Sequence, residues 1–374
     1  MLQSPVSPTI RLSGLLIVLA VSTAHAQTSS RLSVHGYLTQ AYGRSSGDTV
    51  LGLTKQGTAD YRRAAVVGRF SPTDDDALVL ELSNRRLGAS PAMKFEGDLK
   101  VDMAFYQHGF ATGTSVRAGR TLIPFGIFNE TRYAGTLLPF YRPPFSVYSE
   151  GTHTSETIDG IQVSQRLRAG EAWEISADVY GGQFKYLEFG TVFDPVAHRP
   201  EFRGGRMESK SAFGGQVWLQ TPVDGVRVGA SAKRHWDEGG IFPRPGGELV
   251  TDWTGSIDAN FNRLQLRSEQ LYVHTDGFSM NSRYVQGGVR LLSHLSLNAQ
   301  MDFSDLRIVD APFTGQRIPS VRDNALGINV PFSASSVMKL EVHHTNGYNV
   351  EQVANMLGPS LKGSYFISSF SVSF

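Results

Sequence analysis

The chain has 374 residues, a formal net charge of +1 and no cysteine. The absence of cysteine excludes disulfide bonds, thiolate metal sites and a cysteine nucleophile, and the balanced charge gives no indication of nucleic-acid binding. Hydrophobic residues make up 40% of the sequence, which also holds 39 glycines and 10% aromatic residues. This composition is typical of sheet-rich chains with many turns.

The first segment, residues 1–26, has the pattern of a secretory signal peptide. Arg11 precedes a short apolar run at 15–21, and Ala24 and Ala26 form an A-x-A cleavage site. The apolar run is too short for a transmembrane helix, and no later stretch approaches the roughly 20 apolar residues that such a helix needs. We therefore expect cleavage after Ala26 and a single mature domain over residues 27–374.

The rest of the chain alternates apolar and polar residues in segments of about ten residues. In the segment 98–110, for instance, Val101, Met103 and Phe105 alternate with Lys100 and Asp102. Because residues two apart on a strand share a face, each segment predicts a strand with one apolar face and one charged face.

About sixteen such segments can be placed by this period of two, and fourteen or eighteen strands stay open as alternatives. The predicted strands are 31–43, 60–71, 76–84, 98–111, 114–122, 158–167, 173–184, 210–220, 226–236, 250–262, 264–274, 283–292, 295–308, 323–330, 336–345 and 363–374. Short gaps alternate with long ones, and the strand count is even. These features predict an all-β fold, a closed transmembrane antiparallel β-barrel.

The longest gap, residues 123–157, follows the fifth predicted strand and forms the third loop. It is rich in Phe, Tyr, Leu and Pro, a composition that disfavours disorder. Long loops in compact domains usually have a function. A loop of this content has to pack on something, and the interior of the barrel is the available place. We expect it to fold inward and narrow the channel.

The residues that lead into this loop carry a motif. From Arg117 to Arg132 the sequence reads R-x-G-R-x-x-x-P-F-G-x-x-N-E-T-R, and a run rich in Pro and aromatic residues follows at 138–148. The motif resembles the proteobacterial outer-membrane porin family that includes the phosphate-selective (O/P-type) porins. The resemblance implies that the third loop forms the constriction of a pore, and it covers the residues Arg117, Arg120, Pro124, Phe125, Gly126, Asn129, Glu130, Thr131 and Arg132, with Asp159-Gly160 opening the next strand.

The phosphate-specific members of that family use an arginine ladder and lysine clusters. This chain has scattered arginines and no lysine cluster near the loop. The resemblance therefore implies a general porin, and it does not extend to phosphate specificity.

Fixed charges near an inserted loop set the ion preference of a narrow pore. The predicted constriction residues are Arg117, Arg120, Glu130, Arg132, Arg142 and Glu150. The predicted pore-wall residues on the facing strands are Lys100, Asp102, Arg227, Lys233 and Asp258.

The strand pattern leaves alternatives for these residues. Arg117 is expected to point into the lumen, and Arg120 then falls on the opposite face unless a bulge at Gly119 re-aims it. On that opposite face Arg120 would reach toward lipid headgroups. For the loop charges, the alternative is that pairs such as Glu130 and Arg132 only hold the loop to the wall.

The last strand ends the chain on an aromatic residue. Phe366, Phe370 and Phe374 alternate with Ser369 and Ser371, so one face is apolar and the other polar. This resembles the C-terminal strand of a bacterial outer-membrane β-barrel, in which the final Phe helps to present the strand to the insertion machinery. The two ends of the chain thus predict export through the periplasm to the bacterial cell outer membrane.

These features predict a porin for passive diffusion of small hydrophilic solutes or ions, with a weak anion preference because arginines dominate the loop neighbourhood. We expect no enzymatic activity and no cofactor or metal. The expected partners are membrane lipid and lipopolysaccharide, and the resemblance implies a homotrimer.

Three alternatives remain. An outer-membrane barrel enzyme of the lipase or protease type would need a clustered nucleophile and base, and the sequence has no G-x-S-x-G or H-E-x-x-H motif. A gated substrate-specific channel would have a closed lumen. A soluble secreted β protein would not need apolar outer faces on its strands.

Overall fold

The structure is a computed structural model of the chain. It describes residues 31–94, 99–148, 156–170, 172–194, 198–240, 244–309, 315–348 and 360–374. The predicted signal peptide and the predicted constriction residue Glu150 lie outside the described residues.

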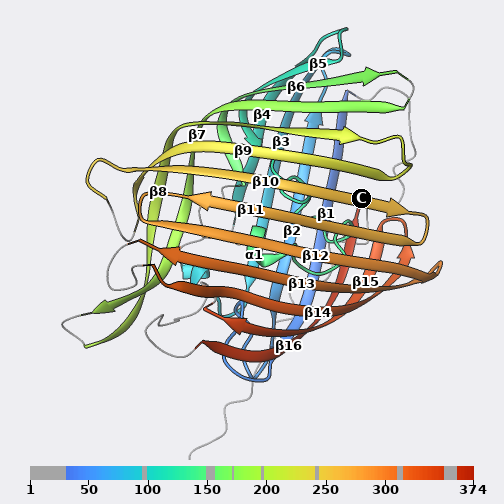
Figure 1. Cartoon of the computed structure of the whole chain (residues 1–374). Helices are drawn as coiled ribbons and strands as arrows, with labels where there is room; N and C mark the ends of the chain where they lie inside the picture. The colour runs from blue at the N-terminus through green and yellow to red at the C-terminus, as the bar shows by residue number, and fades with distance from the viewer. Residues whose placement is uncertain are drawn as a thin grey trace, which may run out of the picture.

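The described residues form sixteen strands that pair in sequence order and close into one antiparallel barrel (Figure 1). The strands are β1 (Leu32–Ser45), β2 (Thr58–Phe70), β3 (Asp76–Leu87), β4 (Lys100–Gly109), β5 (Thr114–Leu122), β6 (Thr157–Ala169), β7 (Trp173–Asp194), β8 (Arg199–Gln220), β9 (Val226–Gly239), β10 (Glu248–Phe261), β11 (Leu264–His274), β12 (Phe278–Leu292), β13 (Leu295–Ile308), β14 (Arg317–Ser333), β15 (Ser336–Gly347) and β16 (Leu361–Ser373). The predicted fold class is therefore confirmed.

The first and last strands close the barrel. Tyr37 of β1 lies opposite Ser373 of β16, and Gly36 and Phe374 exchange two backbone hydrogen bonds of 3.0 Å each. A Cβ atom at Gly36 would lie only 2.5 Å from the Phe374 ring, so the terminal aromatic ring packs directly on this glycine. Closure leaves the sheet without an unpaired edge, which a membrane-spanning sheet requires.

The predicted alternation corresponds to the inner and outer faces of the barrel. On β10, Trp253 and Ile257 point outward and are 48% and 54% exposed, whereas Asp252 and Asp258 point inward and are 0% and 8% exposed. On β16, Phe370 is likewise exposed on the outer face. The outer face is thus apolar, and the polar residues line the interior.

Strand β4 departs from the predicted alternation. The pairing of β3 with β4 shifts register at Asp102, where Val101 lies opposite Leu82 and Met103 opposite Glu81. A bulge of this kind resets the alternation. Val101 points outward as expected, but Met103 and Phe105 point into the barrel, so their prediction as outward residues was wrong.

The hairpin of β7 and β8 is longer than the sequence predicted. Both strands have 22 residues, whereas the pattern ended the first at 184 and began the second at 210. The paired strands project beyond the rest of the barrel, as the hairpin at the lower left of Figure 1. The predicted strands ended before this region, and the prediction therefore missed the extension. Strand β14 is also longer than the predicted 323–330.

The described part of the long connection between β5 and β6, residues 123–148 and 156, folds inside the barrel, and we call it the inner loop. Its described part contains a single helical turn, α1 (Phe145–Tyr148), which contacts β11, β12 and β13 (Figure 1). Inward folding was the prediction for this loop. None of the helices in the described residues is long and apolar enough to cross a membrane.

The inner loop packs through two apolar clusters. The first joins its residues Ile123, Phe125 and Phe128 to wall residues such as Leu271 and Tyr284. The second cluster contains the loop residues Tyr141 and Phe145 together with the wall residues Tyr61, Tyr365 and Ile367. Burial of these side chains stabilises the loop in one position across the lumen.

Candidate functional site

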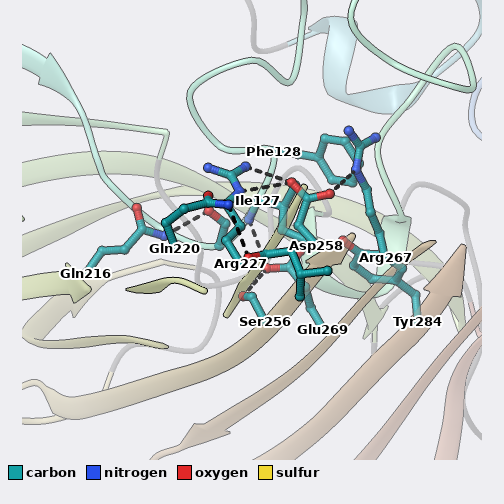
Figure 2. Close-up of polar contacts among 12 residues, drawn as sticks. Ile127, Phe128, Gln216, Gln220, Arg227, Ser256, Asp258, Arg267, Glu269 and Tyr284 are labelled. Atoms are coloured by element: carbon teal, nitrogen blue, oxygen red, sulfur yellow. Dashed lines mark hydrogen bonds and ion pairs between the residues drawn. The ribbon is translucent and has the colours of Figure 1, made fainter. Parts of the chain in front are cut away.

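The first part of the inner loop is fastened to β8, β9 and β11 through its backbone. The amide of Gly126 donates to Ser231 Oγ at 3.1 Å, and Gln216 Nε2 donates to the Gly126 carbonyl at 2.8 Å. The next amide, of Ile127, donates to Glu269 Oε1 at 2.9 Å. Figure 2 shows Gln216, Ile127 and Glu269 converging around this turn of the loop.

Glu269 of β11 is the centre of this attachment. Its fully buried carboxylate accepts hydrogen bonds from Ser256 Oγ at 2.6 Å and Tyr284 Oη at 2.7 Å, and it also accepts one from the hydroxyl of Tyr148 in α1. Burial, with the neighbouring Glu269 charge, raises the pKa of Tyr148 well above its usual value. Tyr148 therefore remains a hydrogen-bond donor at physiological pH.

The second part of the loop is held by two more wall carboxylates. The amide of Tyr141 donates to Glu341 Oε1 at 2.6 Å, and the amide of Ser146 donates to Asp302 Oδ2 at 3.1 Å. Charge-assisted hydrogen bonds of this kind are roughly twice as strong as neutral ones. The loop is thus hydrogen-bonded to side chains of β8, β9, β11, β13 and β15, and its second apolar cluster also packs it against β2 and β16.

Two of the predicted constriction arginines also hold the loop. Arg132 is 3% exposed; its Nη1 donates to Asn129 Oδ1 at 3.0 Å, and its Nη2 donates to the Tyr148 carbonyl. Arg142 is 9% exposed, and its Nη2 donates to Tyr61 Oη at 2.6 Å. Their predicted position in the pore was wrong, because burial under the loop separates both charges from the lumen.

Arg120 lies outside the barrel. It forms a bidentate ion pair with Asp159 of β6, with Nε–Oδ1 and Nη2–Oδ2 distances of 2.7 and 2.8 Å. Both residues share the outer face with Ile161, which is 57% exposed. The pairing of β4 and β5 runs through Gly119 without a register shift. Nothing therefore re-aims Arg120 inward, and its prediction as a constriction residue was wrong.

Arg117 points into the lumen, as expected. Its Nε donates to Gln107 Oε1 of the neighbouring strand at 3.0 Å, and its guanidinium lies 5.5 Å from the centroid of the Phe105 ring. The bulge in β4 creates this contact, because it turns Phe105 inward. Arg117 is thus held against the wall with its charge partly exposed.

Glu130 is the charged residue that the inner loop leaves exposed to the lumen beside this wall. Enclosure by the barrel raises its pKa, and the like charge of Asp178 raises it further, while Arg117 and Arg227 act in the opposite direction. The loop therefore presents one acidic group to a wall that carries both signs of charge.

The wall residues Arg227 and Asp258 form a charged row with Arg267. Asp258 accepts from Arg227 Nη2 at 2.8 Å and from Arg267 Nε at 3.0 Å. Figure 2 shows the two guanidinium groups on either side of this carboxylate. Arg227 stacks 4.3 Å from the Trp218 ring, and Arg267 lies 5.0 Å from the ring of Phe128 in the loop.

Lys233 differs from the other predicted wall residues. Its side chain is 2% exposed, forms a 3.0 Å ion pair with Asp252, and lies 5.9 Å from the Phe125 ring of the loop. Lys233 faces inward, but the loop covers it. Its prediction as an exposed wall charge was therefore wrong.

The remaining predicted wall residues, Lys100 and Asp102, line a small cavity between β2–β4 and the loop. Arg85 and Glu156 line the same cavity, and Arg85 Nη1 donates to Tyr133 Oη of the loop at 2.6 Å. Arg85 and Glu156 were not singled out from the sequence.

Arg267, Glu269 and Asp302 were also missed as members of the site. All three lie at inward positions of strands in which apolar and polar residues alternate. The pattern therefore marked them only as residues of the polar face. Their role depends on where the loop lies, which the pattern does not contain. Within the described residues, no group of three or more His, Asp or Glu side chains is arranged to hold a metal ion.

No protein-family model matches the sequence, and no curated protein matches it either. Solved structures match its fold. OmpT, an outer membrane protein of Vibrio cholerae, aligns with a TM-score of 0.58 and 12% identity over 93% of this chain and 99% of its own. OmpF of Salmonella typhi aligns with a TM-score of 0.60 and 11% identity over 92% of this chain and 97% of its own. The outer membrane channel DcaP of Acinetobacter baumannii aligns with a TM-score of 0.59 and 11% identity over 92% of this chain and 97% of its own.

Proposed function

We propose that this protein is an outer-membrane porin that allows passive diffusion of small hydrophilic solutes. The observation that carries the proposal is the position of the inner loop. It is bound to β2 and β16 as well as to strands from β8 to β15, and it leaves Glu130 exposed and Arg117 of β5, Asp178 of β7 and Arg227 of β9 partly exposed. A closed barrel of this size surrounds an aqueous channel unless its interior is filled.

The proposed orientation follows from the lengths of the connections. Short turns of outer-membrane barrels face the periplasm and longer loops face the outside. Here β8–β9 and β12–β13 are joined by short turns at the end where β1 begins and β16 ends, so that end is periplasmic. The exposed apolar residues of the outer face would contact lipid.

The proposed path runs along β4–β7. On these strands the inward side chains of Phe105, Gln107, Ser164 and Asp178 stay partly exposed. The inward side chains of β10–β15 that meet the loop, such as Glu269, are buried. At the periplasmic end, a polar cavity of about 570 Å³ opens between the short turns and Thr136 of the inner loop.

For ion selectivity we propose a weak anion preference. The charged residues along the proposed path and next to it balance in formal charge. They are the arginines 117, 227 and 267 and the carboxylates 130, 178 and 258. Because the pKa of Glu130 is raised, its negative charge is lost at a higher pH than that of an ordinary glutamate, which favours anions as the pH falls. The preference is weak because Asp258 neutralises much of the charge of Arg227 and Arg267.

A homotrimer is part of the proposal, supported by a trimer form of the structural neighbour OmpT. Membership of the phosphate-selective porin family rests on the motif from Arg117 to Arg132 alone. We propose neither a cofactor nor an enzymatic step, because the polar clusters on the inner face hold the loop in place.

The test is single-channel conductance of the detergent-purified protein in a planar bilayer with a salt gradient. We expect stepwise increases in current as single channels insert, and a reversal potential whose sign shows a preference for anions. Steps in groups of three would support the trimer. A reversal potential of cationic sign would refute the anion preference and leave the porin proposal intact.

A gated channel is the second candidate, and the apolar packing of the loop favours it. The loop buries Phe125, Phe128, Tyr141 and Phe145 in the lumen, which is more than a mere constriction requires. If the correctly folded, heat-modifiable barrel conducts no current, the loop closes the lumen, and the search turns to a substrate or signal that releases it. Hydrolysis of a lipid or peptide by the purified barrel would instead indicate an enzyme.

A further inference from the structure

Four arginines gather on the outer face of β12, β13 and β14, far from the proposed pore. They are Arg283, Arg307, Arg317 and Arg322, and among the described residues Asp305 is the carboxylate that pairs with them. We call these five residues the arginine patch. Together they carry a formal charge of +3, whereas the outward residues that precede them on β13, from Leu295 to Phe303, are apolar.

Cross-strand pairing places the members of the patch side by side. Arg283 and Arg322 lie directly opposite Phe303 from its two sides, and each guanidinium is 5.8 Å from the centroid of that ring. One row further along, Arg307 lies opposite Arg317. The patch is thus built on three rigid, neighbouring strands.

Asp305 holds two of the guanidinium groups in place. It accepts hydrogen bonds from Arg317 and from Arg322. Within the described residues, Arg283 and Arg307 form no ion pair, and both are exposed. Elsewhere on the outer surface, Arg120 is matched one to one by Asp159. The arginine patch has no such balance.

The patch lies at the border of the apolar band. Along β13 the outward residues from the short-turn end are Leu295, Leu297, Ala299, Met301 and Phe303, and then Asp305 and Arg307. From Leu295 to Phe303 the strand extends about 26 Å at its usual rise per residue. A strand tilt of roughly 35–45° reduces this to a height of about 20 Å, so an apolar band of roughly 25 Å ends near Asp305 and Arg307. In the proposed orientation, the arginines reach the level of the lipid headgroups on the extracellular side.

We propose that the arginine patch is a binding site for the phosphate groups of a phosphorylated lipid in the outer leaflet. Guanidinium groups bind phosphate bidentately, and a basic cluster at headgroup level attracts anionic lipid. The phenyl ring of Phe303 fixes two of the arginines, so little freedom is lost on binding. The inference rests on the outer-membrane placement of the barrel and does not depend on an open pore.

Native mass spectrometry of the purified full-length barrel tests the site. The probes are diphosphoryl lipid A, the same lipid after removal of its phosphates, and inorganic phosphate. The variant is Arg283→Gln/Arg307→Gln, which leaves both hydrogen-bonded pairs of Asp305 intact. The control is Arg166→Gln/Arg168→Gln, which removes two exposed arginines at the periplasmic end. A second variant, Arg322→Gln, removes a guanidinium from the Phe303 ring.

We expect the double variant to bind diphosphoryl lipid A about tenfold more weakly or worse, because two charge-assisted contacts are lost. Arg322→Gln should weaken it as well, and the control should bind like the unchanged protein. The proposal would be overturned if the double variant bound diphosphoryl lipid A as tightly as the unchanged protein, or if the control weakened binding as much as the double variant. It would also be overturned if the dephosphorylated lipid bound as tightly as diphosphoryl lipid A. If inorganic phosphate binds as tightly as diphosphoryl lipid A, the claim that the patch recognises a lipid is wrong, and the patch is a site for free anions.

Conductance of the same variants separates this inference from the proposed function. The patch is on the outer face, so we expect unchanged channel steps in the Arg283→Gln/Arg307→Gln variant. The barrel could conduct no current while the Arg283→Gln/Arg307→Gln variant still binds diphosphoryl lipid A more weakly than the unchanged protein. That result would refute the open pore and support the lipid site.

Discussion

At the scale of single residues, the arginines of the loop motif show that the surrounding structure decides where each charge lies. Arg117 faces the lumen, Arg120 pairs with Asp159 outside the barrel, and Arg132 is buried beneath the loop. Their side chains are identical, and their sequence positions are at most 15 residues apart. Of these three arginines, Arg117 alone faces the lumen with its charge partly exposed to water, so in the proposed pore it is the one that would act on a solute.

Glu130 provides a prediction at this scale. Its pKa is raised by enclosure in the barrel, so its protonation begins at a higher pH than for an ordinary glutamate. As pH falls through this raised pKa, Glu130 becomes neutral while the nearby arginines stay charged. Anion preference should therefore increase on acidification, by less than about tenfold in permeability ratio because water and salt screen the lumen.

The variant Glu130→Gln should show the acidic behaviour at neutral pH and lose most of this pH dependence. Reversal potentials across a salt gradient at several pH values measure both effects. Glu201→Gln, in the exposed β7–β8 hairpin, is the control and should behave like the unchanged protein. If Glu130→Gln keeps the full pH dependence, another group controls it.

At the scale of elements, alternation was sufficient to place the strands, and the deviations have local causes. The bulge at Asp102 exchanged the faces of Met103 and Phe105. The β7–β8 hairpin extended beyond the ends of the predicted strands. The inner loop was expected inside the barrel from its composition, but its route followed from contacts with distant strands, such as Ile127 with Glu269.

Gly126 tests how tightly the inner loop is attached. Its φ of 59° lies in the left-handed region, and a Cβ atom there would lie 2.3 Å from Tyr148 Oη and 2.6 Å from Glu269 Oε1. Gly126→Ala should displace the turn, at a cost of about 1–2 kcal/mol from backbone conformation alone, and more from the clash. We expect a lower unfolding temperature and larger or noisier single-channel currents.

Gly246→Ala is the matched control for this variant. Gly246 has a φ of 82°, and a Cβ atom added there would have no atom of the described residues within 4 Å. It should show the backbone cost without a change in conductance. Equal effects of the two variants would mean that the contact of Gly126 with Tyr148 and Glu269 does not hold the loop.

At the scale of the whole molecule, the barrel exists because its first and last strands meet. The seam is made of β1–β16 backbone pairs and of the Phe374 ring over Gly36. All strands are connected to neighbours in sequence except at this seam, so closure there is the contact of longest range. The last residue of the chain therefore contributes to the closure of the whole sheet.

Phe374→Ala should weaken this closure. We expect a fall of roughly 2–4 °C or more in the temperature at which the folded, fast-migrating form disappears in a heat-modifiability gel, with a lower folding yield. Ile257→Ala is the control, because Ile257 is 54% exposed on the outer face of β10, which is not a strand of the seam. An equal loss in the control would assign the effect to apolar surface in general.

The sequence by itself determined the fold class, a strand count near sixteen, the inner and outer faces of most strands and the inward folding of the long loop. These features follow from local periodicity, which membrane and lumen impose on every strand in the same way. The tertiary structure alone decided which charges reach the channel, because Arg132, Arg142 and Lys233 are covered by contacts between residues far apart in sequence. It also decided that Arg283, Arg307, Arg317 and Arg322 form one patch, since only the register of three strands brings them together.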